Sequence, residues 1–174
     1  GVQTCALPIS RVLPPDQRRL DDAELISRLL LTKAARRMRR AGYYCAGLWL
    51  WARSFDDGWS EQRSLPIVND DSALLRALSQ LWAGLRSKVP ASTRIMRVGV
   101  TLFDLSPSNQ RQLDWLENDD IDRQRWERVG NAIDALNTRY ASTVVSVGPW
   151  QPPKGGNVGG KIAFARIPSA EDFW

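Results

Sequence analysis

Two pairs of adjacent aspartates are the first candidates for catalysis in this chain. Asp56-Asp57 and Asp119-Asp120 each have the carboxylates that hold divalent cations in two-metal phosphoryl transfer. Asp56-Asp57 precedes Gly58, which is typical of a hairpin turn, and Asp119-Asp120 precedes a helical pattern, where aspartate caps free N–H groups. We therefore assign structural roles to both pairs, and we predict no catalytic residue, no metal site and no cofactor in this chain.

The composition excludes several other chemistries. No histidine occurs among the 174 residues, which removes Ser-His-Asp and Cys-His catalysis and histidine-ligated zinc. The two cysteines, Cys5 and Cys45, are too few for a disulfide framework and suit a reducing cytoplasm. No apolar run is long enough to cross a bilayer, so we expect a cytoplasmic protein with no membrane partner. Gly155-Gly156 and Gly159-Gly160 lack the Lys-Ser/Thr of a phosphate loop and predict a flexible linker.

The distribution of charge favours a nucleic-acid partner. Lys and Arg number 24 and Asp and Glu 19, a net charge of +5. Lys33 to Arg40 carries five positive charges and no negative one, and Asp114 to Asp122 carries five negative charges and no positive one. A one-signed run without acidic residues one turn away favours phosphate contact over a solvated surface. The predicted DNA-binding residues are this run and the strand arginines: Arg36, Arg37, Arg39, Arg40, Arg53, Arg63, Arg94 and Arg97. The strand register decides which strand arginines share a face.

Hydrophobic periodicity predicts an α+β fold. The first expected helix runs from Asp21, in a capping-box variant with Glu24, to Ala41. The second begins at a cap formed by Asn69 to Ser72 and ends before a loop at Lys88 to Ser92. The expected strands cover residues 11–13, 43–55, 59–65 and 94–105. This β-α-β-β-α-β order closes as a four-stranded sheet with two helices on one face, and leaves the other face open.

The second strand shows which residues that open face carries. Leu48 and Leu50 alternate with Trp49, Trp51 and Arg53, so one face is aliphatic and the other is aromatic and basic. Exposed tryptophans can stack on bases, as in proteins that bind single strands. We expect instead that Trp49 and Trp51 pack beneath a C-terminal helix or against another domain.

The remaining segments flank this domain. Residues 106–120 are expected to be a linker, and residues 121–174 to hold a third helix, short strands at Thr143–Val147 and Lys161–Ile167, and a mobile tail. The apolar stripe expected to pack that helix is Trp126, Val129, Ile133, Leu136 and Tyr140. Gly1 to Ile9 resembles a translated sequencing adapter, so we expect the domain to cover residues 10–105 and the chain to be a fragment.

A series of motifs resembles a known family. The helix end RRMRRAG, the strand and turn LWLWARSFDDG, the returning QRSLP and the strand RIMRVGVTLFDL resemble, in this order, the little-finger domain of Y-family (translesion) DNA polymerases. The later segments DALNTRY and KIAFARIP are similar to the C-terminal extension of the UmuC/ImpB-like branch. The resemblance covers nearly everything from Ser10 onward.

The resemblance implies that this chain binds DNA and that the catalytic residues lie in another domain. Little fingers lie against duplex template-primer DNA and grip its backbone through the open sheet face. The family's metal-binding carboxylates lie in a palm domain, so the parent enzyme is expected to use Mg²⁺ and dNTPs through a missing N-terminal polymerase core. Family members serve SOS-type DNA repair and copy past lesions.

A pentapeptide in the linker resembles the peptide by which bacterial polymerases bind the sliding clamp. Its residues are Gln112, Leu113, Asp114, Trp115 and Leu116. The alternative is an apolar anchor that pins the linker to the domain. Two other functions remain open for the whole chain: a free-standing α/β module that binds RNA or single strands, and a non-catalytic interaction protein.

Overall fold

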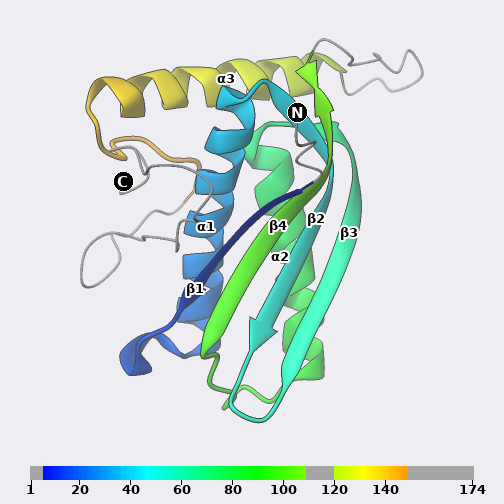
Figure 1. The fold of residues 1–174 in the computed structure, drawn as a ribbon, viewed down its shortest axis with the longest axis vertical. Helices are drawn as coiled ribbons and strands as arrows, with labels where there is room; N and C mark the ends of the chain where they lie inside the picture. Colours follow the sequence, from blue (N-terminus) through cyan, green and yellow to red (C-terminus); the bar gives the residue numbers. More distant parts are fainter. Residues whose placement is uncertain (1–5, 109–119, 149–174) are drawn as a thin grey trace.

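The computed structural model describes residues 6–108 and 120–148, which form an α+β fold with a four-stranded antiparallel sheet (Figure 1). The elements follow the predicted β-α-β-β-α-β order, with a further helix after them. They are β1 (Ala6–Val12), the 3-10 turn η1 (Pro15–Gln17), α1 (Leu20–Arg40), β2 (Tyr43–Arg53), β3 (Gly58–Val68), α2 (Asp71–Lys88), β4 (Arg97–Pro107) and α3 (Asp120–Arg139). None of the helices in these two ranges is both long and apolar enough for a membrane span.

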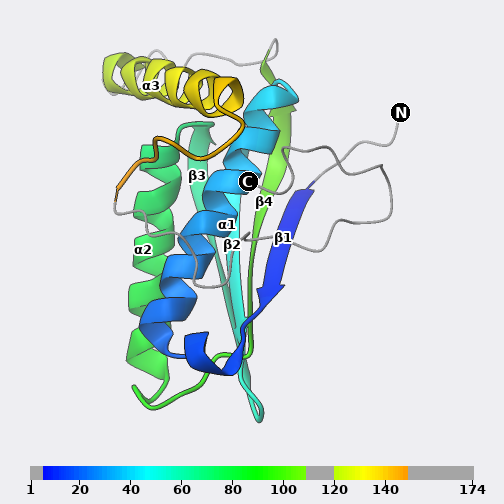
Figure 2. The same cartoon turned by 90° about the vertical axis from the view of Figure 1, so that its left-hand side faces the viewer.

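The strand order in the sheet is β1-β4-β2-β3, with every neighbouring pair antiparallel. Both α1 and α2 lie on one side of the sheet, which confirms the prediction of an open second face (Figure 2). β3 is an edge strand, and this explains why Pro66 lies within it rather than ending it. A proline lacks the backbone N–H, and an edge strand tolerates that loss.

The expectation that residues 1–9 lie outside the fold is wrong for Ala6 to Ile9. These residues form the first half of β1 and pair with Phe103 to Val100 of β4. Ile9 is only 6% exposed because it points from the sheet towards the helices. Residues 1–5 are outside the described part of the chain.

The core lies between the sheet and the two helices, as the alternation predicted. Leu48 and Leu50 of β2 and Val98 and Val100 of β4 are completely buried. The helices contribute the remaining large side chains, with Leu30, Leu31, Met38, Leu74, Leu78, Trp82 and Leu85 among them.

One buried polar pair joins the two helices inside this core. The indole Nε1 of Trp82 on α2 donates a hydrogen bond of 2.8 Å to Oγ of Ser27 on α1. Ser27 in turn donates to the carbonyl of Glu24 at 2.7 Å. Both polar groups are therefore satisfied, as buried polar groups must be.

Two helix ends agree with the sequence and one differs. Gly42 ends α1 with a φ of +73°, and Asp70 caps α2 by accepting from the Ala73 N–H at 2.8 Å. The first turn of α1 differs, because the helix begins at Leu20 without a side-chain cap. The carboxylates of Asp21 and Glu24 instead each lie 2.7 Å from Arg86 of α2. The acidic turn thus ties α1 to α2 rather than capping its own helix.

The third helix packs with a different face from the one predicted. α3 crosses the ends of α1 and α2 (Figure 1). Its buried positions are Gly130 and Asn137, with Asp134 partly buried beside them. The apolar stripe is largely exposed: Trp126 37%, Val129 36%, Leu136 41% and Tyr140 60%. Polar contacts to α1 position this helix, so the expected hydrophobic packing is wrong.

The predicted strand at Thr143–Val147 is also wrong, since the described part of this segment has no regular secondary structure. The backbone groups of this segment form hydrogen bonds with the side chain of Asn137 instead of with another strand. The Asn137 Oδ1 accepts from the N–H groups of Val144 and Val145 at 2.8 and 3.0 Å, and its Nδ2 donates to the Val145 carbonyl at 2.8 Å. The second predicted strand, Lys161–Ile167, lies outside the described residues.

Candidate nucleic-acid interface

The open sheet face is defined by the strand register. Trp49, Trp51 and Arg53 of β2 stand beside Thr101, Gly99 and Arg97 of β4. Regular alternation, up to the irregularity between Cys45 and Gly47, gives these outward positions: Ala6, Pro8, Ser10 and Val12; Gly47, Trp49, Trp51 and Arg53; Gly58, Ser60, Gln62 and Ser64; Arg97, Gly99, Thr101 and Phe103. None of these positions is acidic. The open face is therefore aromatic in its middle and cationic at one end.

The cationic end consists of Arg53 and Arg97, which are direct cross-strand partners. Both side chains are exposed. The Arg97 Nη2 donates to Ser10 Oγ at 3.1 Å, and its guanidinium carbon lies 5.2 Å from the centre of the Trp51 ring. Like charges that face each other across strands destabilise a sheet, so an anion bound between the two guanidinium groups would relieve this repulsion.

The aromatic middle of the face rests on two glycines. A Cβ built on Gly99 would lie 2.5 Å from ring atoms of Trp51, and one built on Gly47 would lie 2.2 Å from the Phe103 ring. Each ring therefore occupies space that only glycine leaves free. α3 lies across the ends of the helices and does not cover these rings (Figures 1 and 2). Packing of Trp49 and Trp51 beneath the C-terminal helix, one of the two expected arrangements, is therefore wrong, and Trp49 is 40% exposed. Packing of these residues against another domain stays a prediction.

Arg39 is not available for phosphate contact, contrary to the prediction. Its Nε donates to Asp134 of α3 at 2.6 Å and its Nη1 to Asp71 of α2 at 2.9 Å. A third bond runs from Nη1 to the Asn69 carbonyl at 2.8 Å, and the side chain is 4% exposed. Burial disfavours the charge of Arg39, but the hydrogen bonds and charges of the two carboxylates outweigh it and raise the pKa of Arg39.

The other arginines of that run have different surroundings. The Arg36 Nε lies 3.6 Å from the Asp134 carboxylate, and burial lowers the pKa of Arg36. Arg36 and Arg39 thus contribute to holding α3 on α1. The acidic partners come from distant parts of the chain, so the absence of acidic residues one turn away did not reveal them. Phosphate binding by Arg37 and Arg40 stays a prediction.

The register of the strands shows on which face of the sheet the predicted strand arginines lie. Arg63 is the cross-strand partner of Leu48, a core residue, so it lies on the helix side of β3 and not on the open face. Arg94 precedes β4 and lines a cleft at the hairpin end of the sheet. Among the eight predicted DNA-binding arginines, the structure places Arg53 and Arg97 together on the open face.

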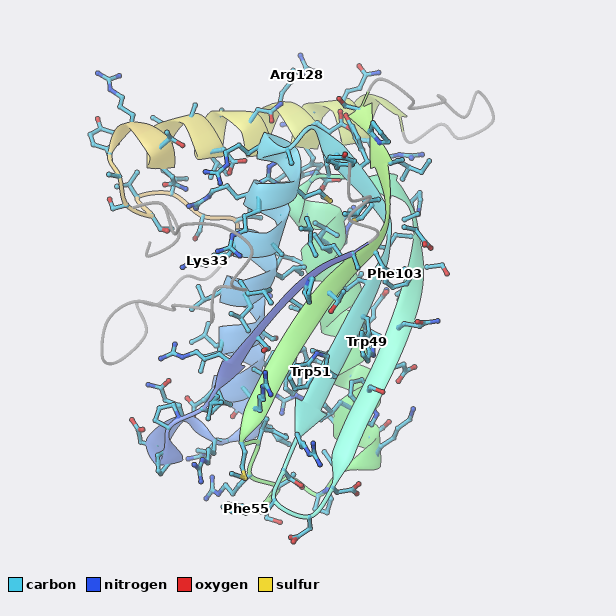
Figure 3. All side chains as sticks on the ribbon, viewed as in Figure 1. Lys33, Trp49, Trp51, Phe55, Phe103 and Arg128 are labelled. Carbon is cyan, nitrogen blue, oxygen red and sulfur yellow. The ribbon has the colours of Figure 1, made fainter. Side chains whose placement is uncertain are left out.

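A cleft at the hairpin end adds residues that sequence reasoning missed. Its volume is about 500 Å³, and its lining includes Phe55, Trp59, Leu85, Lys88 and Arg94. Phe55 at the hairpin tip is 72% exposed (Figure 3). The guanidinium carbon of Arg18 lies 5.7 Å from the Phe55 ring centre, and Lys88 Nζ lies 5.8 Å from that of Trp59. An aromatic residue beside the turn sequence DDG was the only local signal for this site.

The described residues offer little for bond-making chemistry. No group of three or more Asp, Glu, Cys or His side chains in the two described ranges could hold a metal ion. Burial raises the pKa of the Cys45 thiol to about 12, so it stays protonated and is a poor nucleophile. Asp57 belongs to the hairpin turn, where its Oδ1 accepts from the Gly58 N–H at 2.8 Å. The predicted clamp-binding residues Gln112 to Leu116, and Asp119, lie outside the described residues.

The sequence matches the C-terminal domain of the impB/mucB/samB family over residues 8–115, and the chain belongs to this family. The match confirms the predicted class, the little-finger domain of a Y-family polymerase. It starts at Pro8, inside the segment that was expected to be an artefact, in agreement with the pairing of β1. No curated protein matches the chain.

Solved structures that are similar to this chain include the following two. One is the crystal structure of DinB from Sulfolobus solfataricus, with 17% identity, a TM-score of 0.45 and 57% of this chain covered. The chain spans only 28% of that protein. The other is the little-finger domain of PolIV in complex with the beta-clamp processivity factor, with 17% identity, a TM-score of 0.45, and 64% of this chain and 99% of that chain covered.

Proposed function

We propose that this chain is the DNA-holding C-terminal region of an error-prone translesion DNA polymerase in the cytoplasm. The observation that carries the proposal is the Arg53–Arg97 pair on the open sheet face, where none of the regularly alternating outward positions is acidic, in a chain of the impB/mucB/samB family. Phosphate contacts by arginine give affinity that does not depend on base sequence, which suits a domain that follows the polymerase along template-primer DNA.

The remaining parts of the function belong to the whole polymerase. We propose that the reaction itself is carried out by an N-terminal polymerase core, in which carboxylates would hold Mg²⁺ and the dNTP. We further propose that Gln112 to Leu116 docks on the bacterial sliding clamp. The support for this docking is the pentapeptide itself, with a glutamine and large apolar side chains among acidic residues.

The first test is the salt dependence of duplex binding. The logarithm of the affinity of the full chain for a labelled primer-template duplex should fall with the logarithm of salt concentration by about 0.9 per neutralised phosphate. Replacing both Arg53 and Arg97 by glutamine should reduce this slope by up to about 1.8, because two phosphate contacts are lost. Fluorescence anisotropy over a salt series measures the slope.

The matched control replaces Arg63 and Arg76 by glutamine. This double variant has the same change in net charge, but Arg63 lies on the helix side of β3 and Arg76 is exposed on α2. Its slope should stay close to that of the unchanged chain. An equal effect of both double variants would mean that net charge, rather than the open face, determines binding.

The second test concerns activity. The purified chain should incorporate no nucleotide on a primed template with Mg²⁺ or Mn²⁺, because its described residues hold no carboxylate cluster for two metal ions. Primer extension resolved on a denaturing gel measures this activity. Extension that copurifies with the chain through successive columns would contradict the assignment of the reaction to a separate core.

A further inference from the structure

The aromatic rings on the open face, exposed Trp49 and half-buried Trp51 and Phe103, lie on the two central strands of the sheet. Trp49 and Trp51 belong to β2 and Phe103 to β4, and β4 and β2 are the inner strands of the order β1-β4-β2-β3 (Figure 3). Trp49 and Trp51 are two residues apart, so they follow one another at about 7 Å along the strand. Aromatic residues on the central strands of a four-stranded sheet are a common device for stacking nucleobases.

The residues around the rings favour, as the ligand of this face, a polyanion that carries flat groups rather than an apolar protein surface. The rings are bordered by the hydroxyl and amide side chains of Ser60, Gln62 and Ser64 on one side and by Arg97 on another. Arg97 lies against Trp51, and none of the outward positions named above is acidic. A nucleic-acid strand would pair its phosphates with the arginines and its bases with the rings.

A paired duplex can contact the arginines of this face but does not stack on its rings, because its bases are stacked inside the helix and only their edges are accessible in the grooves. We therefore propose that the open face of this domain also binds unpaired single-stranded DNA by stacking bases on Trp49 and its neighbouring rings. This inference rests on the proposed function and extends it from duplex to the single-stranded part of a template-primer junction.

Trp49 is the residue to test, since it is exposed on the surface and Trp51 is needed to cover Gly99. Replacing Trp49 by leucine should weaken binding of a short labelled oligothymidylate about tenfold, and leave the affinity for duplex DNA within about twofold. Trp49→Phe keeps an aromatic face and should restore most of the lost affinity. Thermal unfolding of both variants checks that the sheet is intact.

The control is Trp126→Leu on α3, where a tryptophan has nearly the same exposure, 37% against 40%. This variant should leave both affinities unchanged. Unchanged oligothymidylate binding by Trp49→Leu would overturn the inference, and so would an equal loss for duplex and single strand. Tighter binding of oligouridylate than of oligothymidylate would overturn it in favour of an RNA ligand.

The two proposals fail in different ways. If neither duplex nor single strand binds, the proposed function is wrong and the inference falls with it. If duplex binding depends on Arg53 and Arg97 while single-strand binding is independent of Trp49, the inference alone is wrong.

Discussion

Replacing Arg39 by leucine is expected to lower the free energy of unfolding of the chain by about 3 kcal/mol. Arg39 joins α1 to both Asp71 at the start of α2 and Asp134 of α3, with its side chain 4% exposed. The Asp71 side chain is 6% exposed, so removing its partner leaves a buried carboxylate without the bidentate hydrogen bonds it has now. Urea denaturation followed by circular dichroism measures the loss.

The loss should depend on pH in a defined direction. Burial raises the pKa of the Asp71 carboxyl, and the Arg39 charge opposes this rise. Without Arg39 the pKa of Asp71 in the folded state rises further above its unfolded value. A carboxyl with a raised pKa stabilises the fold at acidic pH, and this contribution disappears as the pH rises through the folded-state pKa. The deficit of the variant should therefore grow as the pH rises above about 4, the ordinary pKa of an aspartate.

The matched control for this experiment is Arg76→Leu, which removes the same charge from an exposed position of α2. Surface substitutions of this kind usually change stability by no more than about 0.5 kcal/mol. If Arg39→Leu were as mild as the control, the buried ion pairs would not hold the three helices together, and the packing of α3 on α1 would need another cause.

Binding of the chain to a bacterial sliding clamp is expected to be lost when Trp115 and Leu116 are both replaced by alanine. The two side chains lie in the segment between β4 and α3, and acidic residues surround them in the sequence. Apolar anchors of this kind carry most of the binding energy of a docked peptide, about 2 kcal/mol or more each, so affinity should fall about a thousandfold. Surface plasmon resonance against immobilised clamp measures the change.

Thermal stability distinguishes docking from an anchoring role of the same residues. The double variant should unfold at nearly the same temperature as the unchanged chain, and a Val129→Ala, Leu136→Ala variant on the exposed stripe of α3 should keep full clamp binding. Persistent clamp binding by the Trp115, Leu116 variant would show that the pentapeptide is not the docking peptide. A large drop in its unfolding temperature would identify it as an apolar anchor of the linker.

The sheet could be predicted from the sequence because its two faces differ in composition. Leu48 and Leu50 alternate with Trp49 and Trp51, and period-two alternation is independent of distant parts of the chain. The orientation of α3 could not be predicted in this way. Its apolar stripe indicated one packing face, but ion pairs with Arg36 and Arg39, about a hundred residues earlier in the sequence, fix another face.

In the candidate site, too, some features could be predicted from the local sequence and others depend on distant parts of the chain. That Arg53 shares a face with Trp49 and Trp51 follows from position along one strand. The strand register decides that Arg97 lies beside Arg53 on this face and that Arg63 lies on the opposite face. A shift of one residue in the register would reverse both assignments. The cleft near Phe55 combines residues from the hairpin and the end of α2, so only the tertiary structure shows it.

The place of β1 in the sheet has a consequence for handling and biosynthesis of the domain. β1 is an edge strand whose partner, β4, is made much later; Ser10 and Arg97, which are in contact, are 87 positions apart. On the ribosome β1 therefore stays unpaired until β4 has emerged, whereas β2 and β3 close as a local hairpin. A version shortened to begin at Ser10 would leave Val100 to Phe103 of β4 with free backbone groups along one edge. With Ala6 to Ile9 present, the edge at this place belongs to β1, whose Pro8 lacks the backbone N–H needed for regular pairing with another copy. The shortened version is therefore expected to aggregate more readily than the full chain.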